Sequence, residues 1–344
     1  MSEPVTRLDV FKTYKLFVGG KFPRSESGRV YEVTDPKGDW LANAPLGTRK
    51  DTRDAVAAAR KAFGGWSGAT AYNRGQILYR VAEMLQGRRE QFAAEVAAAE
   101  GVGGRTAAAL VDAAIDRWVW YAGWTDKIAQ IAGAANPVAG PYFNLSTPEP
   151  TGVVGVLAPQ GGTGHSLLGL VSVVAPAIAA GNTVVVAAAE ATPLPALSLG
   201  EVLATSDLPG GVVNLLSGRT ADIAPTLASH QDVNALDLAG AVTGDGPASA
   251  KALETAAADT LKRVFRATGR SGQGPSSPKA GEEGGVFRAT GRSGQGPSSP
   301  KAGEEGGVFR PAVDPAAEDW TAAPGTERLL AFLETKTVWH PMGV

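Results

Sequence analysis

The sequence contains no cysteine and only three histidines among its 344 residues. Without cysteine there can be no disulfide bond, no thiolate metal site and no thiol nucleophile. The histidines, His165, His230 and His340, lie far apart and have no ligand partner at helical spacing. The sequence therefore predicts no metal site.

Net charge and long apolar runs are also lacking. The formal net charge is -2, which favours neither nucleic acid nor an anionic membrane as a partner. Glycine, proline or polar residues interrupt each apolar stretch before it reaches the roughly 18 residues that a membrane span needs. The first residues show no apolar signal-peptide core. We expect a cytoplasmic protein with no membrane partner.

The first part of the chain predicts a hairpin followed by helices. Residues 15–22 read KLFVGGKF, two short apolar runs joined by Gly19-Gly20, which is typical of a two-residue turn. Helical patterns follow over residues 51–63, 75–102 and 105–130. The aromatic residues of the last helix are expected in the core.

From Gly152 the pattern changes to strands that alternate with helices. Four short apolar runs, GVVGVL, TVVVAA, GVVNLL and VNALDL, are separated by segments of helical length. Such alternation predicts an α/β fold with a doubly wound, Rossmann-like parallel sheet that is covered on both faces. Ligands of such sheets bind outside the carboxyl ends of the strands.

An identical tandem repeat follows the last predicted helix, which ends in KRVF. FRATGRSGQGPSSPKAGEEGGV occupies residues 265–286 and again 287–308. Ordering a residue costs about 1–2 kcal/mol, and these units have too few large apolar side chains to offset that cost. We predict a disordered tandem-repeat linker over residues 265–310; a role for its arginines and lysines in a bound state is the alternative. Residues 311–344 then predict a helix and a strand over Thr335–His340.

Together, the motifs resemble the aldehyde dehydrogenase superfamily. KLFVGGKF, DPKGDWLANAPLGT and NRGQILYRVAEML are similar to its N-terminal region, and APAIAAGNTVVVAAAEATPLPALSL and LPGGVVNLLSG to its nucleotide-binding half. The resemblance covers most of residues 15–240 and the last dozen. It implies an N-terminal and nucleotide-binding domain over residues 1–264. It also implies a small oligomerisation β-element, formed by an arm at about 127–150 and the C-terminal strand, and a missing catalytic domain.

The resemblance also shows what chemistry is lost. Family members oxidise aldehydes with a cysteine thiolate and NAD(P), and this chain has no thiol and no match to the family's ELGGK segment. Pro159-Gln160-Gly161 stands where the family's PWN motif supplies an oxyanion-hole asparagine. Losing one such donor typically costs about 3–4 kcal/mol of transition-state stabilisation. We therefore assign no catalytic residue.

For the cofactor, the resemblance points to Glu190, Gly218 and Gly240 as binding residues. The family's ribose-binding lysine is replaced by Ala187 and its TGS serine by Ala241, so NAD(P) is a candidate cofactor with weakened contacts. The loop Gly161–Gly164 has two interpretations, a phosphate cradle or a tight turn between strand and helix.

Several functions follow from these features. The short C-terminal ending resembles the non-catalytic second head of two-headed aldehyde dehydrogenases, which predicts a pseudoenzyme. It would stabilise a complete aldehyde dehydrogenase, or self-associate, through Thr335–His340. The alternatives are an NAD(P)-binding module, an oxidoreductase active only with a catalytic partner, and a decayed gene product. An enzyme with a serine or threonine nucleophile is a further alternative, for which the sequence identifies no acid to orient His165.

Overall fold

The computed structural model describes residues 10–267 and 318–342. Most of the predicted linker, residues 268–310, lies outside the described residues, as do residues 1–9, 311–317 and 343–344. The division of the chain into the predicted domains therefore stays a prediction.

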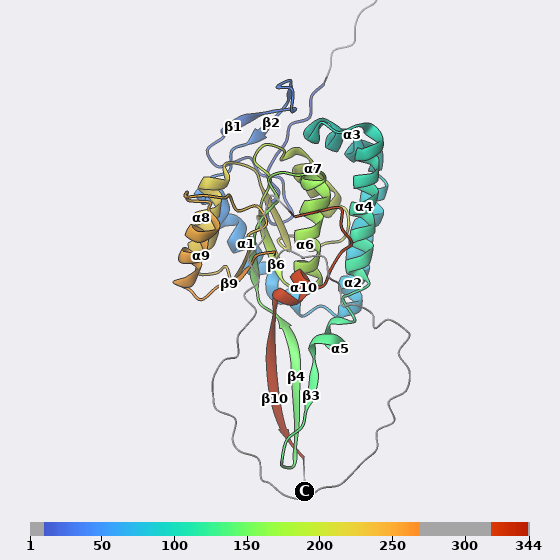
Figure 1. Ribbon diagram of the computed structural model, residues 1–344, viewed down its shortest axis with the longest axis vertical. Helices are drawn as coiled ribbons and strands as arrows, with labels where there is room; N and C mark the ends of the chain where they lie inside the picture. The colour runs from blue at the N-terminus through green and yellow to red at the C-terminus, as the bar shows by residue number, and fades with distance from the viewer. Residues whose placement is uncertain (1–9, 268–317, 343–344) are drawn as a thin grey trace, which may run out of the picture.

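A five-stranded sheet forms the centre of the molecule (Figure 1), and its strands are parallel in the order β7-β6-β5-β8-β9. The strands are β5 (Val153–Leu157), β6 (Thr183–Ala187), β7 (Val213–Leu216), β8 (Ala235–Asp237) and β9 (Arg263–Phe265). The first four are the predicted strands. The fifth corrects the sequence analysis, because residues 263–265 were predicted to end the last helix, with Phe265 opening the linker, and they form β9 instead.

Helices cover both faces of this sheet, as two separate apolar clusters show. One face carries a short π-helix, η1 (His165–Gly169), with α6 (Leu170–Ala179) and α7 (Leu194–Ala204), and outside them α2 (Ala71–Gln86), α3 (Arg89–Glu100) and α4 (Gly104–Ala122). The other face carries α1 (Arg49–Ser67), α8 (Thr220–Ser229) and α9 (Ala250–Ala258). The predicted doubly wound α/β fold is confirmed.

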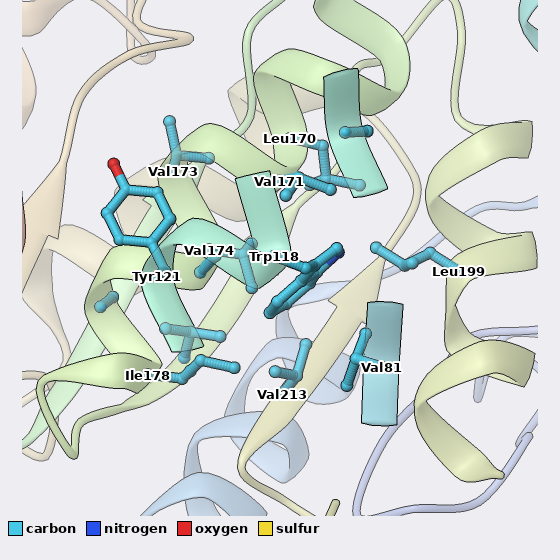
Figure 2. Packing of buried hydrophobic residues seen from close by; sticks show 14 of the residues in the cluster. Val81, Trp118, Tyr121, Leu170, Val171, Val173, Val174, Ile178, Leu199 and Val213 are labelled. Atoms are coloured by element: carbon cyan, nitrogen blue, oxygen red, sulfur yellow. The ribbon is translucent and has the colours of Figure 1, made fainter. Parts of the chain in front are cut away.

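Trp118 of α4 lies at the centre of the larger cluster (Figure 2). Its side chain is fully buried, and Val81, Val174 and Leu199 lie around it. The helix predicted over residues 105–130 is in fact two helices, because α4 ends at Ala122 and α5 (Ile128–Ala132) follows a turn. The prediction that its aromatic residues belong to the core holds fully for Trp118 and Tyr121, while Trp120 and Trp124 are half-buried.

The first described residues form a tight turn, which is followed by a pair of short strands. Val18 and Lys21 pair across Gly19 and Gly20, which both have positive φ (61° and 76°), so the predicted hairpin turn is confirmed. The strands β1 (Val30–Thr34) and β2 (Trp40–Pro45) then form an antiparallel pair.

A separate three-stranded sheet extends away from the body (Figure 1), with the strand order β10-β4-β3. Its antiparallel strands are β3 (Ala134–Asn136), β4 (Tyr142–Pro150) and β10 (Leu333–Pro341). The predicted small β-element is therefore present. The C-terminal strand is longer than Thr335–His340 and includes Pro341, which a strand at the edge of a sheet tolerates.

The segment that leads into β10 packs into the body of the molecule. Trp320, Leu329 and Phe332 are at most 2% exposed and belong to the same apolar cluster as α4 and α6. Leu329 lies in α10 (Glu327–Ala331). Arg117 of α4 donates to the carbonyl oxygens of Trp320 (3.1 Å) and Ala322 (2.6 Å). The described C-terminal residues thus share a core with the rest of the chain.

Candidate functional site

The predicted cofactor-binding residues lie along one edge of the central sheet. Glu190, Gly218 and Gly240 follow β6, β7 and β8, and the Pro159–Gly161 segment follows β5. Because the strands are parallel, these loops meet at their carboxyl ends. The chain order reverses between β5 and β8, which makes this edge a topological switch point.

Gln160 connects the loops that follow β5 and β6. Its Nε2 donates to the carbonyl oxygen of Ala158 at 2.8 Å, and its Oε1 accepts from the backbone N–H of Glu190 at 2.9 Å. The side chain therefore holds the two loops together. Gly161, which the resemblance implies as the replacement of an oxyanion asparagine, follows it and has no side chain.

Glu190 is exposed and its carboxylate lies at the start of α8. Its Oε2 accepts from the backbone N–H of Thr220 at 3.0 Å, a favourable position for a negative charge at a helix N-terminus. The hydroxyl of Tyr31 donates to the backbone oxygen of Glu190 at 3.1 Å. Burial, and next the negative charge of Glu190, raise the pKa of Tyr31 above its ordinary value.

Two glycines on this edge allow close backbone packing. At Gly240 an added Cβ would lie 1.9 Å from the carbonyl oxygen of Ala158, so β5 and the loop after β8 can approach only without a side chain there. Gly218 has a φ of +146°, and an added Cβ would lie 2.9 Å from the backbone nitrogen of Gly47. Both have a structural role, and their part in binding NAD(P) stays a prediction.

Ala187 and Ala241, where the resemblance implies a lost lysine and a lost serine, have apolar surroundings in the structure. Ala187 ends β6 and is 1% exposed within the cluster on the α1 face, and Ala241 is 5% exposed in the same cluster. Neither offers a cation or a hydroxyl to a ligand at this edge.

The glycine-rich loop ends at a helix start that is already occupied. Gly162 and Gly164 have φ values of +88° and +83°, as a tight turn requires. The backbone N–H groups of Gly164 (2.7 Å) and Ser166 (2.9 Å) donate to the carboxylate of Glu100, the last residue of α3. A phosphate would have to displace this buried negative charge, so of the two interpretations the structure supports the tight turn.

His165 lies beside the same carboxylate and contacts a threonine. Its Nδ1 is 3.7 Å from Oε1 of Glu100 and 2.7 Å from the carbonyl oxygen of Gly162. Its Nε2 is 2.7 Å from Oγ1 of Thr192, in the loop between β6 and α7. No sequence pattern indicates this cluster, because Glu100 and Thr192 are far from His165 along the chain and no motif assigns either of them a role.

The residues at this edge do not fit the phosphates of a dinucleotide. Free N–H groups at helix starts are the usual partners of a pyrophosphate. Here Glu100 occupies the start of the helix after β5, Glu190 occupies the start of α8, and the hydroxyl of Ser249 accepts from Ala252 at the start of α9. The carboxylate of Glu190 is exposed at this edge and can accept a bond from a ribose hydroxyl.

Metal ligands and membrane spans were also sought in the described residues. Within residues 10–267 and 318–342, no three side chains of His, Asp or Glu are grouped to hold a metal ion. No helix in the same ranges combines the length and the hydropathy needed to cross a membrane.

A comparison with protein families decides what kind of protein this is. The model of the family described as "Aldehyde dehydrogenase family" matches residues 22–271, more than half of the chain. The chain belongs to the aldehyde dehydrogenase family. The resemblance noted from the motifs is thereby confirmed, and the parallel sheet is the nucleotide-binding fold of this family.

Individual aldehyde dehydrogenases support the assignment. The chain is 34% identical over 269 residues to retinal dehydrogenase 2 of Gallus gallus, covering 77% of this chain and 50% of that protein. It is 33% identical over 272 residues to cytosolic 10-formyltetrahydrofolate dehydrogenase of Mus musculus, covering 77% and 29%. Among solved structures, the NAD+ complex of an aldehyde dehydrogenase from Bacillus cereus matches with a TM-score of 0.66 and 29% identity, covering 74% and 50%.

The coverage shows how much of an aldehyde dehydrogenase this chain contains. It spans about half the length of retinal dehydrogenase 2 and of the Bacillus cereus enzyme, and under a third of the mouse protein. The family model matches residues 22–271 of this chain.

Proposed function

We propose that this chain is a non-catalytic aldehyde dehydrogenase that serves as an interaction subunit for a complete, cysteine-bearing member of the family. The chain has no thiol for the attack on an aldehyde, and Gly161 and Ala241 lack the side chains that the family uses at its oxyanion and cofactor sites. The resemblance to the second head of two-headed aldehyde dehydrogenases supports the same function.

The observation that carries the proposal is an exposed apolar face on the three-stranded sheet. The register pairs Phe143 with His340 and Leu145 with Val338, and residues directly opposite in antiparallel strands share a face. Phe143, Leu145 and Val338 are 56%, 45% and 42% exposed. We call these three residues the docking face. Neighbouring exposed apolar side chains of this kind mark interaction surfaces.

The opposite face of the sheet carries polar groups beside two exposed aromatic side chains, Tyr142 (44% exposed) and Trp339 (58% exposed). There Asn136 donates to Oδ1 of Asn144 (2.7 Å) and Oγ of Ser146 (2.8 Å), and Ser146 lies 3.1 Å from the hydroxyl of Thr337. Hydrogen bonds within the sheet thus use these polar groups. On β10, Lys336 and Val338 lie on the side of the docking face, and Thr337 and Trp339 on the other.

Co-purification tests the proposal. The tagged chain is co-expressed with a cysteine-bearing aldehyde dehydrogenase from the same cell, and the complex is measured by size-exclusion chromatography with light scattering. Val338→Glu should abolish the complex, because a carboxylate would be buried against apolar side chains. Thr335→Glu, on the same strand but the opposite face, should leave it intact.

Two results would speak against an interaction subunit. A chain that remains monomeric with each such dehydrogenase overturns the proposal, and a homo-oligomer lost in Val338→Glu assigns the docking face to self-association instead. Oxidation of short and aromatic aldehydes by the isolated chain with NAD would overturn the non-catalytic part.

Binding of NAD(P) is the second candidate function, and the exposed carboxylate of Glu190 at the sheet's ligand-binding edge favours it. Titration calorimetry of the full chain with NAD and NADP tests it. Heat that disappears in Glu190→Gln would support binding at this edge, and no heat at millimolar ligand would exclude it.

A further inference from the structure

Three side chains from distant parts of the chain meet beside the carboxyl end of β5. Glu100 ends α3, His165 begins η1, and Thr192 lies between β6 and α7. Thr192 Oγ1 is 2.7 Å from His165 Nε2, and Glu100 Oε1 is 3.7 Å from His165 Nδ1. The three groups therefore lie in a row in space, hydroxyl, imidazole and carboxylate, as in enzymes that use an activated hydroxyl.

The hydrogen bonds fix the tautomer of His165. Its Nδ1 faces the carbonyl oxygen of Gly162 at 2.7 Å, and a carbonyl oxygen only accepts hydrogen bonds. In the neutral ring the proton is therefore on Nδ1. Nε2 carries the free electron pair and accepts from the hydroxyl of Thr192, which is the arrangement that a general base needs.

Glu100 supplies the negative charge beside the imidazole. Its side chain is 3% exposed, and it accepts from the N–H groups of Gly164 and Ser166 and from the Ser166 hydroxyl (2.6 Å). These bonds hold the carboxylate in place next to His165.

The pair lies just below the surface where two loops meet. His165 and Thr192 are each 8% exposed, whereas Gly162 and Thr163 on one loop and Ala191 on the other are exposed. The hydroxyl of Thr192 therefore lies close in the chain to exposed residues of the loop. A short acyl chain needs the least room beside side chains as buried as these two.

We propose that Thr192 and His165 form a hydrolytic site for esters or thioesters of small acyl groups. Thr192 Oγ1 attacks the acyl carbonyl carbon while its proton passes to His165 Nε2. The bond to the alcohol or thiol breaks, and the leaving group takes that proton. Water then attacks the acyl-threonine, gives one proton to His165 and releases the acid, after which the proton returns to Thr192. Glu100 is a positioning residue.

This reaction requires neither a thiol, a nicotinamide nor a partner, so it goes beyond the interaction function and stands or falls separately from it. The test uses the full chain and p-nitrophenyl acetate without NAD. Release of p-nitrophenol gives the rate, and mass spectrometry of the quenched protein locates the acetyl group. Thr192→Val keeps the shape without the hydroxyl, and Thr192→Ser restores a hydroxyl.

Two control variants separate the site from background reactions. Thr255→Ala removes an exposed threonine in α9, on the other face of the central sheet, and His230→Gln removes a histidine outside the cluster. We expect Thr192→Val and His165→Gln to lose at least about 100-fold in rate, as for removal of a general base, while both controls and Thr192→Ser keep the activity. Glu100→Gln should lower kcat and leave KM unchanged.

The outcomes decide whether the Thr192 site exists, for variants whose thermal unfolding midpoints show that they are folded. Acetyl-Thr192 in the wild type together with the loss in Thr192→Val supports the site. If Thr192→Val does not fold, acetylation of Thr192 in the wild type and of the serine in Thr192→Ser carries the decision. A wild-type rate no higher than that of His165→Gln, or acetylation only elsewhere, overturns the proposal.

Discussion

Arg328 and Asp237 form an ion pair inside the molecule, with 2.8 Å between Nε and Oδ2. Asp237 lies in β8 and is fully buried, and Arg328 also donates to both carboxylate oxygens of Glu318 at 2.6 and 2.8 Å. Burial favours the neutral guanidine, but Asp237 and Glu318 outweigh it and raise the pKa of Arg328. The segment leading to β10 is therefore attached to the central sheet by charge as well as by apolar packing.

Removing this arginine should destabilise the protein strongly. In Arg328→Met the carboxylate of Asp237 stays buried without its cation, and breaking such a pair costs about 3–5 kcal/mol. Urea unfolding measures the loss. Glu149→Gln is the matched control, because Glu149 forms an exposed pair with Lys336 (3.0 Å), and exposed pairs contribute at most about 1 kcal/mol. Equal losses in the two variants would contradict a structural role for the buried pair.

A methyl group at position 240 should disturb the cofactor edge. In Gly240→Ala the new Cβ would overlap the carbonyl oxygen of Ala158, so β5 and the loop after β8 must separate. We expect a loss of about 1–3 kcal/mol, as for other overpacked sites. Gly161→Ala, where an added Cβ meets nothing within 4 Å, is the control. Similar thermal midpoints for both alanine variants would refute the close packing.

His230 should make stability fall in mildly acidic solution. Burial, followed by the charges of Lys262, Arg53 and Arg60, lowers its pKa below the ordinary value of 6.5, although Asp232 opposes this. The unfolded state then binds more protons than the folded state, so the contribution is complete above about pH 6.5 and is lost as the pH falls toward the folded-state pKa. Its Nδ1 also accepts from the N–H of Asp232 (3.1 Å), which requires the neutral ring.

Chemical unfolding between pH 5 and 7 checks this expectation. The stability of the wild type should fall more steeply than that of His230→Gln over this range, and the two curves should run parallel above it. A wild-type curve that remains parallel to the variant throughout would show that His230 does not titrate differently in the two states.

The parts of the fold with a strong local pattern were predictable. The strands β5 to β8 are short apolar runs bounded by glycine or polar residues, and burial on both faces demands such runs. β9 was missed because it has three residues, and its strand conformation depends on pairing with β8. The break between α4 and α5 was missed because Gly123 lies within a sequence that otherwise continues a helical pattern.

The candidate sites were predictable only where a motif marks them. Glu190, Gly218 and Gly240 were found through their resemblance to family motifs, and parallel pairing places them along one edge. Nothing in the sequence relates Glu100 to His165, because their proximity arises from the packing of α3 against η1. The sequence pattern likewise places the buried Asp237 in an apolar strand. It does not indicate the ion-pair partner, Arg328, which lies far along the chain.

The pairing of β10 with β4 affects how the molecule is made. Leu333 lies opposite Pro150 and Pro341 opposite Tyr142, so one edge of β4 finds its partner only after a long further stretch of chain has been synthesised. During translation that strand edge stays open until β10 emerges. Open edges invite pairing with other chains, so this nascent protein should depend on chaperones more than its small size suggests.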